Sequence, residues 1–317
     1  MEQLLLDDSL KLSELDSRDR FAILREIFFR QKVPKDPALF PRLDTRPPAN
    51  QYYIKTIDNI VKMNKNATIK DLKDFYKLND YGLRSEEFTR DHSGKHILFA
   101  GCSNTFGMGM PEYAIWPKLV YEKISKTEKL SGFFNVGISG GTITEIFNQI
   151  VAYSSKFGVP DVLFINLPEH GREAGRLVRS ERPDRLTMSQ LNFMVLNEIV
   201  VGYYKAIMSL FNAFNTEIYL MSWDHHFLRP RKEDNPLLIQ NDPRSRMPGI
   251  FVPDPDELAK YCLDYEDSDT YKNDKLSKEF SLMSLDEDHP GFAVHSYWAE
   301  KMHDLYVSKK TIQSFLL

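Results

Sequence analysis

An alternation of short apolar runs with helix-like segments begins at residue 96 and limits the possible folds more than any other pattern in the chain. The apolar runs have the length and composition of buried strands, and they cover residues 96–100, 133–136, 162–165 and 217–221. Helical patterns follow them at residues 113–126, 143–156, 190–214 and 291–307. Strands that alternate with helices build βαβ units around a parallel sheet. We therefore predict an α/β domain whose ligand site lies at the carboxyl ends of the strands.

Composition narrows the class of protein further. Of the 317 residues, 42% are hydrophobic, which is enough for a sizeable core, and the net charge of −4 argues against nucleic acid as a partner. No run of apolar residues is long enough for a membrane span. The N-terminus lacks the basic and apolar regions of a secretory signal, so a cytoplasmic setting is expected. Two cysteines, Cys102 and Cys262, do not make a disulfide framework.

The first 80 residues differ from the rest and are interpreted as a helical and extended appendage. Residues 13–32 have apolar positions at helical spacing, and residues 33–50 carry five prolines, which favour an extended arm. Thr68 and Asp71 have the spacing of a capping box at the start of another helix. A structural appendage and an arm that binds a partner or a second copy both remain open.

Residues 225–285 are predicted to form a long connection with one helix at 255–263. The segment is rich in Asp, Pro and Lys. A connection of this length within a compact domain is usually functional or mobile. A lid over the substrate and a surface insertion are equally compatible with its composition.

Three polar segments could carry chemistry. Ser103 follows the first strand, where it could be a nucleophile or only cap a helix. Residues 137–141 contain three glycines, whose N–H groups could face an anion or simply form a turn before Thr142. Asp286 and His289 stand three residues apart, so the carboxylate could hold the imidazole Nδ1–H and leave Nε2 free to take a proton. The alternative for this last pair is an acidic surface turn.

The order of these segments resembles that of the SGNH family, also called GDSL-like hydrolases. Residues 99–107 match its first block, with Cys102 at a position where the family usually has Asp. Residues 135–140 match its second block, and Asp286 to Pro290 match its last. Trp116-Pro117 resembles a dipeptide that is common in the family about a dozen residues after the serine. Residues 81–88 resemble the segment that precedes the first block in some carbohydrate-esterase-like members. The resemblance covers residues 81–307 and leaves out the first 80.

The resemblance implies a fold, a triad and an oxyanion hole. The fold would be a flavodoxin-like three-layer sandwich with a parallel sheet over residues 81–317, preceded by the helical N-terminal extension. Ser103 would be the nucleophile, His289 the general base and acid, and Asp286 its orienting partner. The N–H groups of Ser103 and Gly140 would stabilise the oxyanion. The mechanism needs no cofactor and no metal ion.

One position departs from the family pattern. The third block normally supplies an Asn side chain as a further oxyanion donor, and this chain has Glu169 there. An ionised Glu would repel the oxyanion by an energy on the order of 4 kcal/mol at about 4 Å. Glu169 could be protonated by burial or pair with Arg172 or Arg176. Alternatively, Asn166 or His170 could donate in its place.

A second polar cluster follows the fourth strand. Trp223 and His225, together with Arg172 after the third strand, are candidates for contacts with substrate. Asp224, His225 and His226 could instead bind a metal ion, but such sites usually need more ligands. Structural hydrogen bonding is the third interpretation of this cluster.

The predicted function is hydrolysis of an ester, with an O-acetyl or other small acyl group on a carbohydrate as the expected substrate. Two rival functions remain. One is a non-catalytic SGNH-fold module that binds a glycan or a partner, and the other is an O-acyltransferase. Similar proteins whose first block contains Gly-Cys-Ser, as at residues 101–103 here, occur among tailed-phage gene products. A virion-associated setting is therefore also open.

Overall fold

The computed structural model describes residues 7–16, 19–20, 23, 47–168, 202–203, 205–206, 209, 214–223, 250–251 and 253–310. Within these residues, five parallel strands form one sheet in the order β2-β1-β3-β4-β5. The strands are β1 (Ile97–Gly101), β2 (Phe134–Asn135), β3 (Val162–Leu167), β4 (Glu217–Ser222) and β5 (Ile250–Phe251). This is the strand order of flavodoxin-like doubly wound sheets. The prediction of an α/β fold with a parallel sheet is confirmed.

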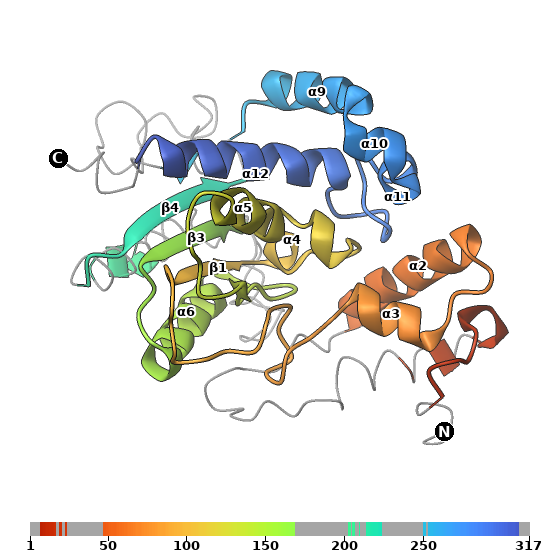
Figure 1. Cartoon of the computed structure of the whole chain (residues 1–317). Helices are drawn as coiled ribbons and strands as arrows, with labels where there is room; N and C mark the ends of the chain where they lie inside the picture. Colours follow the sequence, from red (N-terminus) through yellow and green to blue (C-terminus); the bar gives the residue numbers. More distant parts are fainter. Residues whose placement is uncertain are drawn as a thin grey trace, which may run out of the picture.

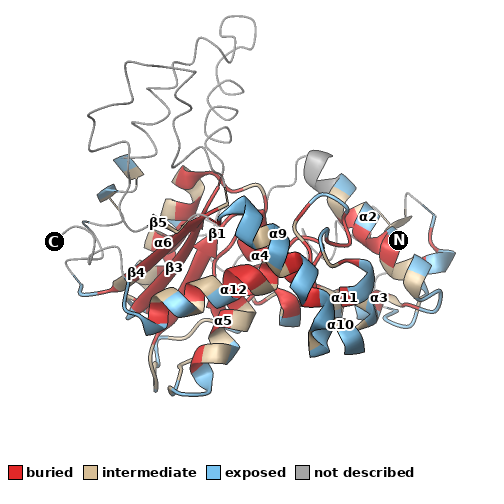
Figure 2. Ribbon diagram, turned by 90° about the horizontal axis from the view of Figure 1, so that it is seen from above, coloured by how far each residue is buried: buried red, intermediate tan, exposed pale blue. Residues whose placement is uncertain are grey.

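Helices cover both faces of this sheet, as Figures 1 and 2 show. Leu163 and Ile165 of β3 point into a core shared with α6 (Ile143–Phe157). Val162 and Phe164, which alternate with them, face a second core shared with α5 (Trp116–Ser125) and α12 (Phe292–Val307). Because successive side chains of a strand point to opposite faces of the sheet, β3 contributes residues to both cores.

Local sequence signals explain the bounds of the helices. Thr142 accepts from the N–H of Glu145, and Glu145 accepts from the N–H of Thr142, so a full capping box begins α6. The predicted helix at 113–126 is divided, because a short turn η3 (Glu112–Ala114) precedes α5 and Pro117 sits in the first turn of α5. The predicted helix at 190–214 lies almost entirely outside the described residues.

The described part of the 225–285 segment is built into the domain. It adds β5 to the edge of the sheet, which the sequence analysis did not predict. It continues with α9 (Pro255–Asp264), η7 (Tyr265–Asp267), α10 (Asp269–Asn273) and α11 (Lys275–Glu279). Cys262, Tyr265 and Phe280 are buried in the core cluster that also contains residues of α12. This part is therefore a structural layer, while residues 225–249 lie outside the described residues.

The N-terminal part contains η1 (Leu12–Glu14), α2 (Pro47–Met63) and α3 (Ile69–Phe75). The predicted capping box of Thr68 and Asp71 is present at the start of α3. The extended arm predicted for residues 33–50 is wrong at its end, because α2 begins at Pro47, where a first-turn proline suits a helix. Most of the predicted helix at 13–32 lies outside the described residues.

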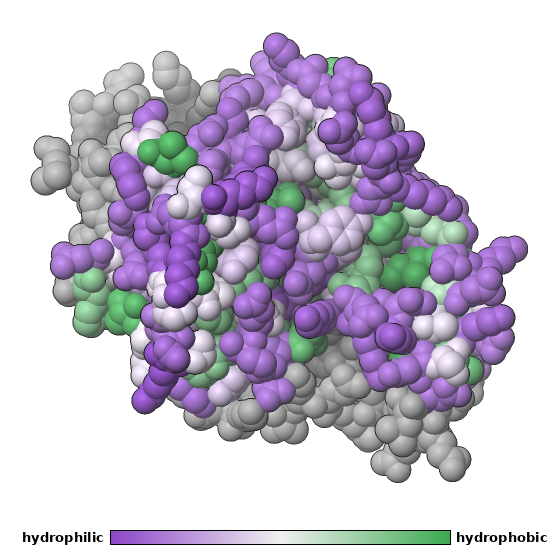
Figure 3. Space-filling view, viewed as in Figure 1, coloured by the Kyte–Doolittle hydropathy of each residue, from purple (hydrophilic) through white to green (hydrophobic). Residues whose placement is uncertain are grey.

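The N-terminal helices share a core with the α/β domain. Tyr53, Ile57 and Leu72 pack together with Phe106 and Met108, in the segment that follows β1. Figure 3 shows apolar side chains along the boundary between these helices and the rest, on a face that is otherwise mainly hydrophilic. The N-terminal helices are thus packed onto the part of the sheet edge where a ligand site is expected.

Neither a membrane span nor a disulfide is found among the described residues. None of the described helices combines the length and the apolar content that crossing a membrane requires. Cys102 and Cys262 are both buried and unpaired.

Two buried histidines predict a loss of stability in acid. Burial, aided by the stacked ring of His92 at 3.6 Å, lowers the pKa of His96 from 6.5 to about 4. Burial also lowers the pKa of His295 from 6.5 to about 3. The unfolded chain therefore binds more protons than the folded one below pH 6.5. The free energy of unfolding should be at its full value above that pH and fall as the pH drops toward 4.

Denaturant titrations between pH 7.5 and 4 measure this dependence, since each tenfold difference in proton affinity between the folded and unfolded states corresponds to about 1.4 kcal/mol. The variant His96→Gln should flatten the slope relative to the wild type, because it removes one of the two groups. A wild-type stability that stays constant down to pH 4 would contradict the prediction.

Candidate active site

Ser103 lies on a sharp turn between β1 and α4 (Ser103–Phe106). Gly101 makes this turn feasible, since a Cβ there would lie 2.0 Å from Thr105 Oγ1 and 2.8 Å from the carbonyl oxygen of Asn166. The hydroxyl of Ser103 is buried and makes no hydrogen bond to any described residue. A buried hydroxyl without a hydrogen-bond partner among the described residues needs an explanation, and a catalytic role is one.

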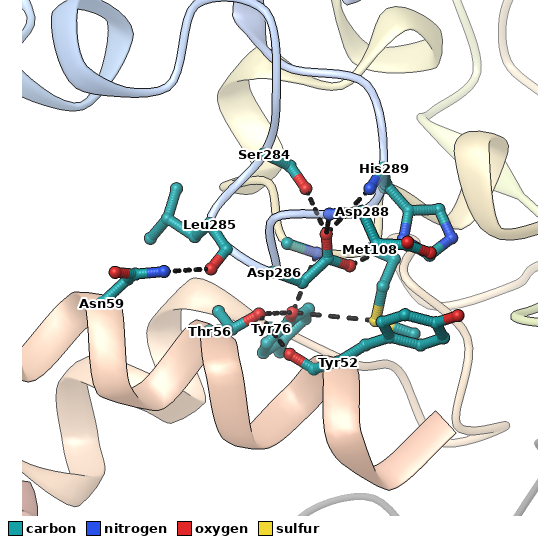
Figure 4. A network of polar contacts seen from close by, with 12 residues as sticks. Tyr52, Thr56, Asn59, Tyr76, Met108, Ser284, Leu285, Asp286, Asp288 and His289 are labelled. Atoms are coloured by element: carbon teal, nitrogen blue, oxygen red, sulfur yellow. Dashed lines mark hydrogen bonds and ion pairs between the residues drawn. The ribbon is translucent and has the colours of Figure 1, made fainter. Parts of the chain in front are cut away.

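Asp286 and His289 form a buried pair in the turn that precedes α12. His289 Nδ1 lies 2.7 Å from Asp286 Oδ2. The other carboxylate oxygen, Oδ1, accepts from Ser284 Oγ at 2.6 Å and from the N–H groups of Asp288 and His289 at 3.0 and 2.9 Å. Figure 4 shows these donors converging on the carboxylate. The predicted contact between Asp286 and His289 is thus present.

The surroundings of Asp286 favour its ionised form. Burial alone would raise the pKa of this carboxyl group, but the hydrogen bond and charge of His289 and the hydrogen bond of Ser284 outweigh it and lower the pKa below 3.8. An ionised carboxylate only accepts hydrogen bonds, so Nδ1 of His289 is the donor. His289 Nε2 is then the nitrogen that can take a proton.

The segment after α4 joins the serine turn to the aspartate turn. The N–H groups of Gly107 and Met108 donate to the carbonyl oxygen of Ser103, and the N–H of Leu285 donates to Gly109 O at 3.0 Å. A Cβ at Gly109 would lie 2.5 Å from Ser284 Oγ, so only glycine allows this approach. Gly109 and Ser284 were not predicted as site residues from the sequence. The Gly-x-Gly spacing after Ser103 was the one signal for the first of them.

A buried arginine braces the end of α4. The Arg84 guanidinium donates to Gly107 O at 2.6 Å and to Phe75 O at 2.7 Å, and it lies over the ring of Tyr76. Burial lowers the pKa of Arg84 to about 10, a value at which the group still carries its charge at neutral pH. Arg84 therefore links α3 to the turn that ends the helix of Ser103.

The glycine-rich loop after β2 is fastened against α4. Asn135 accepts from the N–H of Gly137 at 2.8 Å and donates to Thr105 O at 3.0 Å. Gly140 has a φ of 71°, a left-handed conformation that glycine adopts without strain. Ser103 begins α4, so its N–H has no acceptor within the helix. The two predicted oxyanion donors therefore lie on neighbouring loops at the same edge of the sheet.

Asn166 is a buried amide without a partner among the described residues. It pairs with Gly101 across the sheet, and its position on β3 directs the side chain to the α12 face with Phe164. Both Nδ2 and Oδ1 are buried, and neither bonds to a described residue. An unsatisfied buried amide lowers the stability of the fold by about 1–3 kcal/mol. A role in function is one explanation for such a group in a native protein.

The other predicted site residues are placed only in part. Trp223 follows β4, half-buried against the core of the α12 face, while Glu169, His170, Arg172, Arg176 and the cluster at 224–226 lie outside the described residues. Ser103 Oγ forms no hydrogen bond with His289 in this structure. Such catalytic hydrogen bonds often tighten only when substrate binds. Within the described part of the chain, no three His, Cys, Asp or Glu side chains are grouped to hold a metal ion.

Fold and site together define an α/β protein in which a buried Asp–His pair is linked through Gly109 to the segment that follows Ser103. No protein-family model matches the chain, and a search of curated proteins finds no relative. The geometry of the site is therefore the basis for assigning a function.

Proposed function

We propose that the protein is a serine hydrolase of the SGNH type, which cleaves an ester through Ser103, His289 and Asp286. The observation that carries this proposal is the buried hydrogen bond between Asp286 and His289, 2.7 Å long, directly against the segment that follows Ser103. An Asp that fixes the imidazole tautomer serves to prepare a general base. The strand order and the helices on both faces of the sheet are compatible with the proposed family fold.

The mechanism proceeds through an acyl-enzyme. Ser103 Oγ attacks the ester carbonyl carbon while His289 Nε2 takes the hydroxyl proton. The N–H groups of Ser103 and Gly140 stabilise the negative oxygen that forms. The C–O bond to the alcohol then breaks, and His289 returns its proton to the leaving oxygen. Water, deprotonated by His289, attacks the acyl-enzyme. The bond between the acyl carbon and Ser103 Oγ then breaks, His289 returns the proton to Oγ, and the acid is released.

The proposed substrate is a carbohydrate that carries an O-acetyl or other small acyl group. This choice rests on the resemblance of residues 81–88 to carbohydrate-esterase-like members, because fold alone does not determine the substrate. Release of acetate from p-nitrophenyl acetate and from a panel of acetylated polysaccharides tests it. Turnover that depends on Ser103 supports the proposal.

A second candidate function is a binding module for a glycan or a partner. It is favoured by the absence of a hydrogen bond between Ser103 and His289. A folded wild-type protein that hydrolyses no ester but binds an unacetylated polysaccharide of the same panel would support it. Transfer of the acyl group to an added sugar alcohol, in preference to water, would instead indicate an O-acyltransferase.

Asn166→Leu tests whether the unpartnered amide is the third oxyanion donor. We expect kcat to fall by about 10²- to 10³-fold, the usual effect of losing one such donor. We also expect an unchanged or higher Tm, because an apolar side chain replaces a buried amide with no partner among the described residues. Steady-state kinetics and thermal melts measure the two effects.

The matched control is Gln149→Leu. Gln149 is a buried amide on α6 that also bonds to no described residue. The Gln149→Leu variant should also have an unchanged or higher Tm, but its kcat should equal that of the wild type. If Asn166→Leu keeps the wild-type kcat, Asn166 is not an oxyanion donor.

A further inference from the structure

One face of α2 is directed at the turn that holds Asp286 and His289. Tyr52, Thr56 and Asn59 follow one another at the spacing i, i+4, i+7, which aligns them along the helix. Figure 4 shows this face beneath the turn, with the side chains of all three residues on the side of Asp286. Ile57 lies on a different face, in the core with Leu72.

Asn59 holds the residues on both sides of Asp286. Its Nδ2 donates to Leu285 O at 2.8 Å and to Glu287 Oε1 at 3.1 Å, and the side chain is buried. Glu287 has a φ of 60°, a left-handed conformation that costs a non-glycine residue about 1–2 kcal/mol. A single amide group therefore fastens a strained residue next to the aspartate that must face His289.

Two more contacts reach the same turn from the N-terminal helices. The ring of Tyr52 meets the His289 imidazole edge to face, with centroids 5.1 Å apart. The hydroxyl of Tyr76, after α3, accepts from the N–H of Gly109 at 3.0 Å and donates to Thr56 at 3.3 Å. Gly109 in turn contacts the aspartate turn through Leu285.

We infer that α2 completes the active site, with Asn59 as a positioning residue that sets the geometry of the Asp286–His289 pair. The inference rests on the proposed function for its kinetic consequence only. In this arrangement Asn59 fixes the Glu287 conformation, which places the Asp286 carboxylate, and Tyr52 limits rotation of the His289 ring. The N-terminal helices are then a required part of the catalytic unit.

The test compares Asn59→Leu with the wild-type full-length chain. We expect kcat to fall about tenfold to a hundredfold with KM unchanged, because small displacements of catalytic groups have effects of this size. The downfield NMR resonance of the His289 Nδ1 proton should shift or broaden. Ile57→Val, a buried change on another face of α2, should leave kcat and this resonance unchanged.

Glu287→Gly separates positioning from support of the fold. Glycine adopts the left-handed conformation without strain, so the turn no longer needs Asn59 to hold it. The double variant Asn59→Leu/Glu287→Gly should recover part of the lost kcat. If the double variant returns the His289 Nδ1 resonance to its wild-type position but kcat stays low, the positioning role is overturned, because the geometry is then restored without the activity. Tyr52→Phe should retain more of the wild-type kcat than Tyr52→Leu, because the ring contact is kept.

The outcomes distinguish the two proposals. If the wild type hydrolyses esters and Asn59→Leu keeps both its kcat and its resonance, the positioning role is wrong and the hydrolase stands. If the wild type hydrolyses no ester, the hydrolase proposal fails, and the resonance alone decides the role of Asn59. A shifted resonance in Asn59→Leu then supports positioning, and an unshifted one overturns it.

Discussion

Replacing Ser103 with alanine is expected to lower kcat for ester hydrolysis by about 10⁴- to 10⁶-fold. The variant has no hydroxyl to attack the carbonyl, so only the oxyanion donors and substrate binding would contribute to the remaining rate. The melting temperature should stay close to that of the wild type, because Ser103 Oγ has no hydrogen bond to any described residue. Release of p-nitrophenol and a thermal melt measure both quantities.

The control for this prediction is Ser155→Ala. Ser155 lies on α6, and its hydroxyl donates to the carbonyl oxygen of Ala152 in the same helix. Its loss should leave kcat unchanged. Unaltered turnover in Ser103→Ala would remove Ser103 from the mechanism. Loss of labelling by a fluorophosphonate probe in the same variant would identify Ser103 directly.

Asp286→Asn is expected to lower kcat by about 10⁴-fold. The amide removes the charge that stabilises the imidazolium and no longer fixes the proton on His289 Nδ1. It also presents N–H groups to a position that now accepts from Ser284 and two backbone N–H groups. Steady-state kinetics with a thermal melt separate the catalytic loss from the accompanying loss of stability.

The sign of the pH dependence follows from the lowered pKa of Asp286. The stability that its ionised form contributes is present above pH 3.8 and is lost as the pH falls further through the folded-state pKa. Asp286→Asn should lack this contribution at neutral pH. Asp288→Asn is the matched control, because only the backbone N–H of the exposed Asp288 bonds to Asp286. If Asp288→Asn were the inactive variant, the orienting role would belong to Asp288.

Features that depend on neighbouring residues were predicted from the sequence. β1, β3 and β4 begin within one residue of their predicted starts, because an apolar run buried on both faces has a distinctive composition. The predicted helix cap at Thr68 involves residues only three positions apart. The contact of Asp286 with His289 has the same short range. Short separations such as these leave a pattern that can be read along the chain.

Features that depend on distant residues could not be predicted. β5 consists of two residues and is a strand only because β4 lies beside it. The pair of prolines at 47 and 48 indicated an extended arm, whereas the shared core with Phe106 and Met108 supports a helix there. Glu287 has no local residue type that signals its left-handed conformation.

The alternation of strands and helices, the turn that carries Ser103 and the Asp286–His289 pair are all encoded locally. Each of these follows from periodicity or from hydrogen bonds within a few residues. The position of α2 against the catalytic turn has a different origin, since Asn59 is 226 residues from Leu285 and 228 from Glu287. Contacts at such separations arise from packing of whole helices in the folded chain, and no local pattern encodes them.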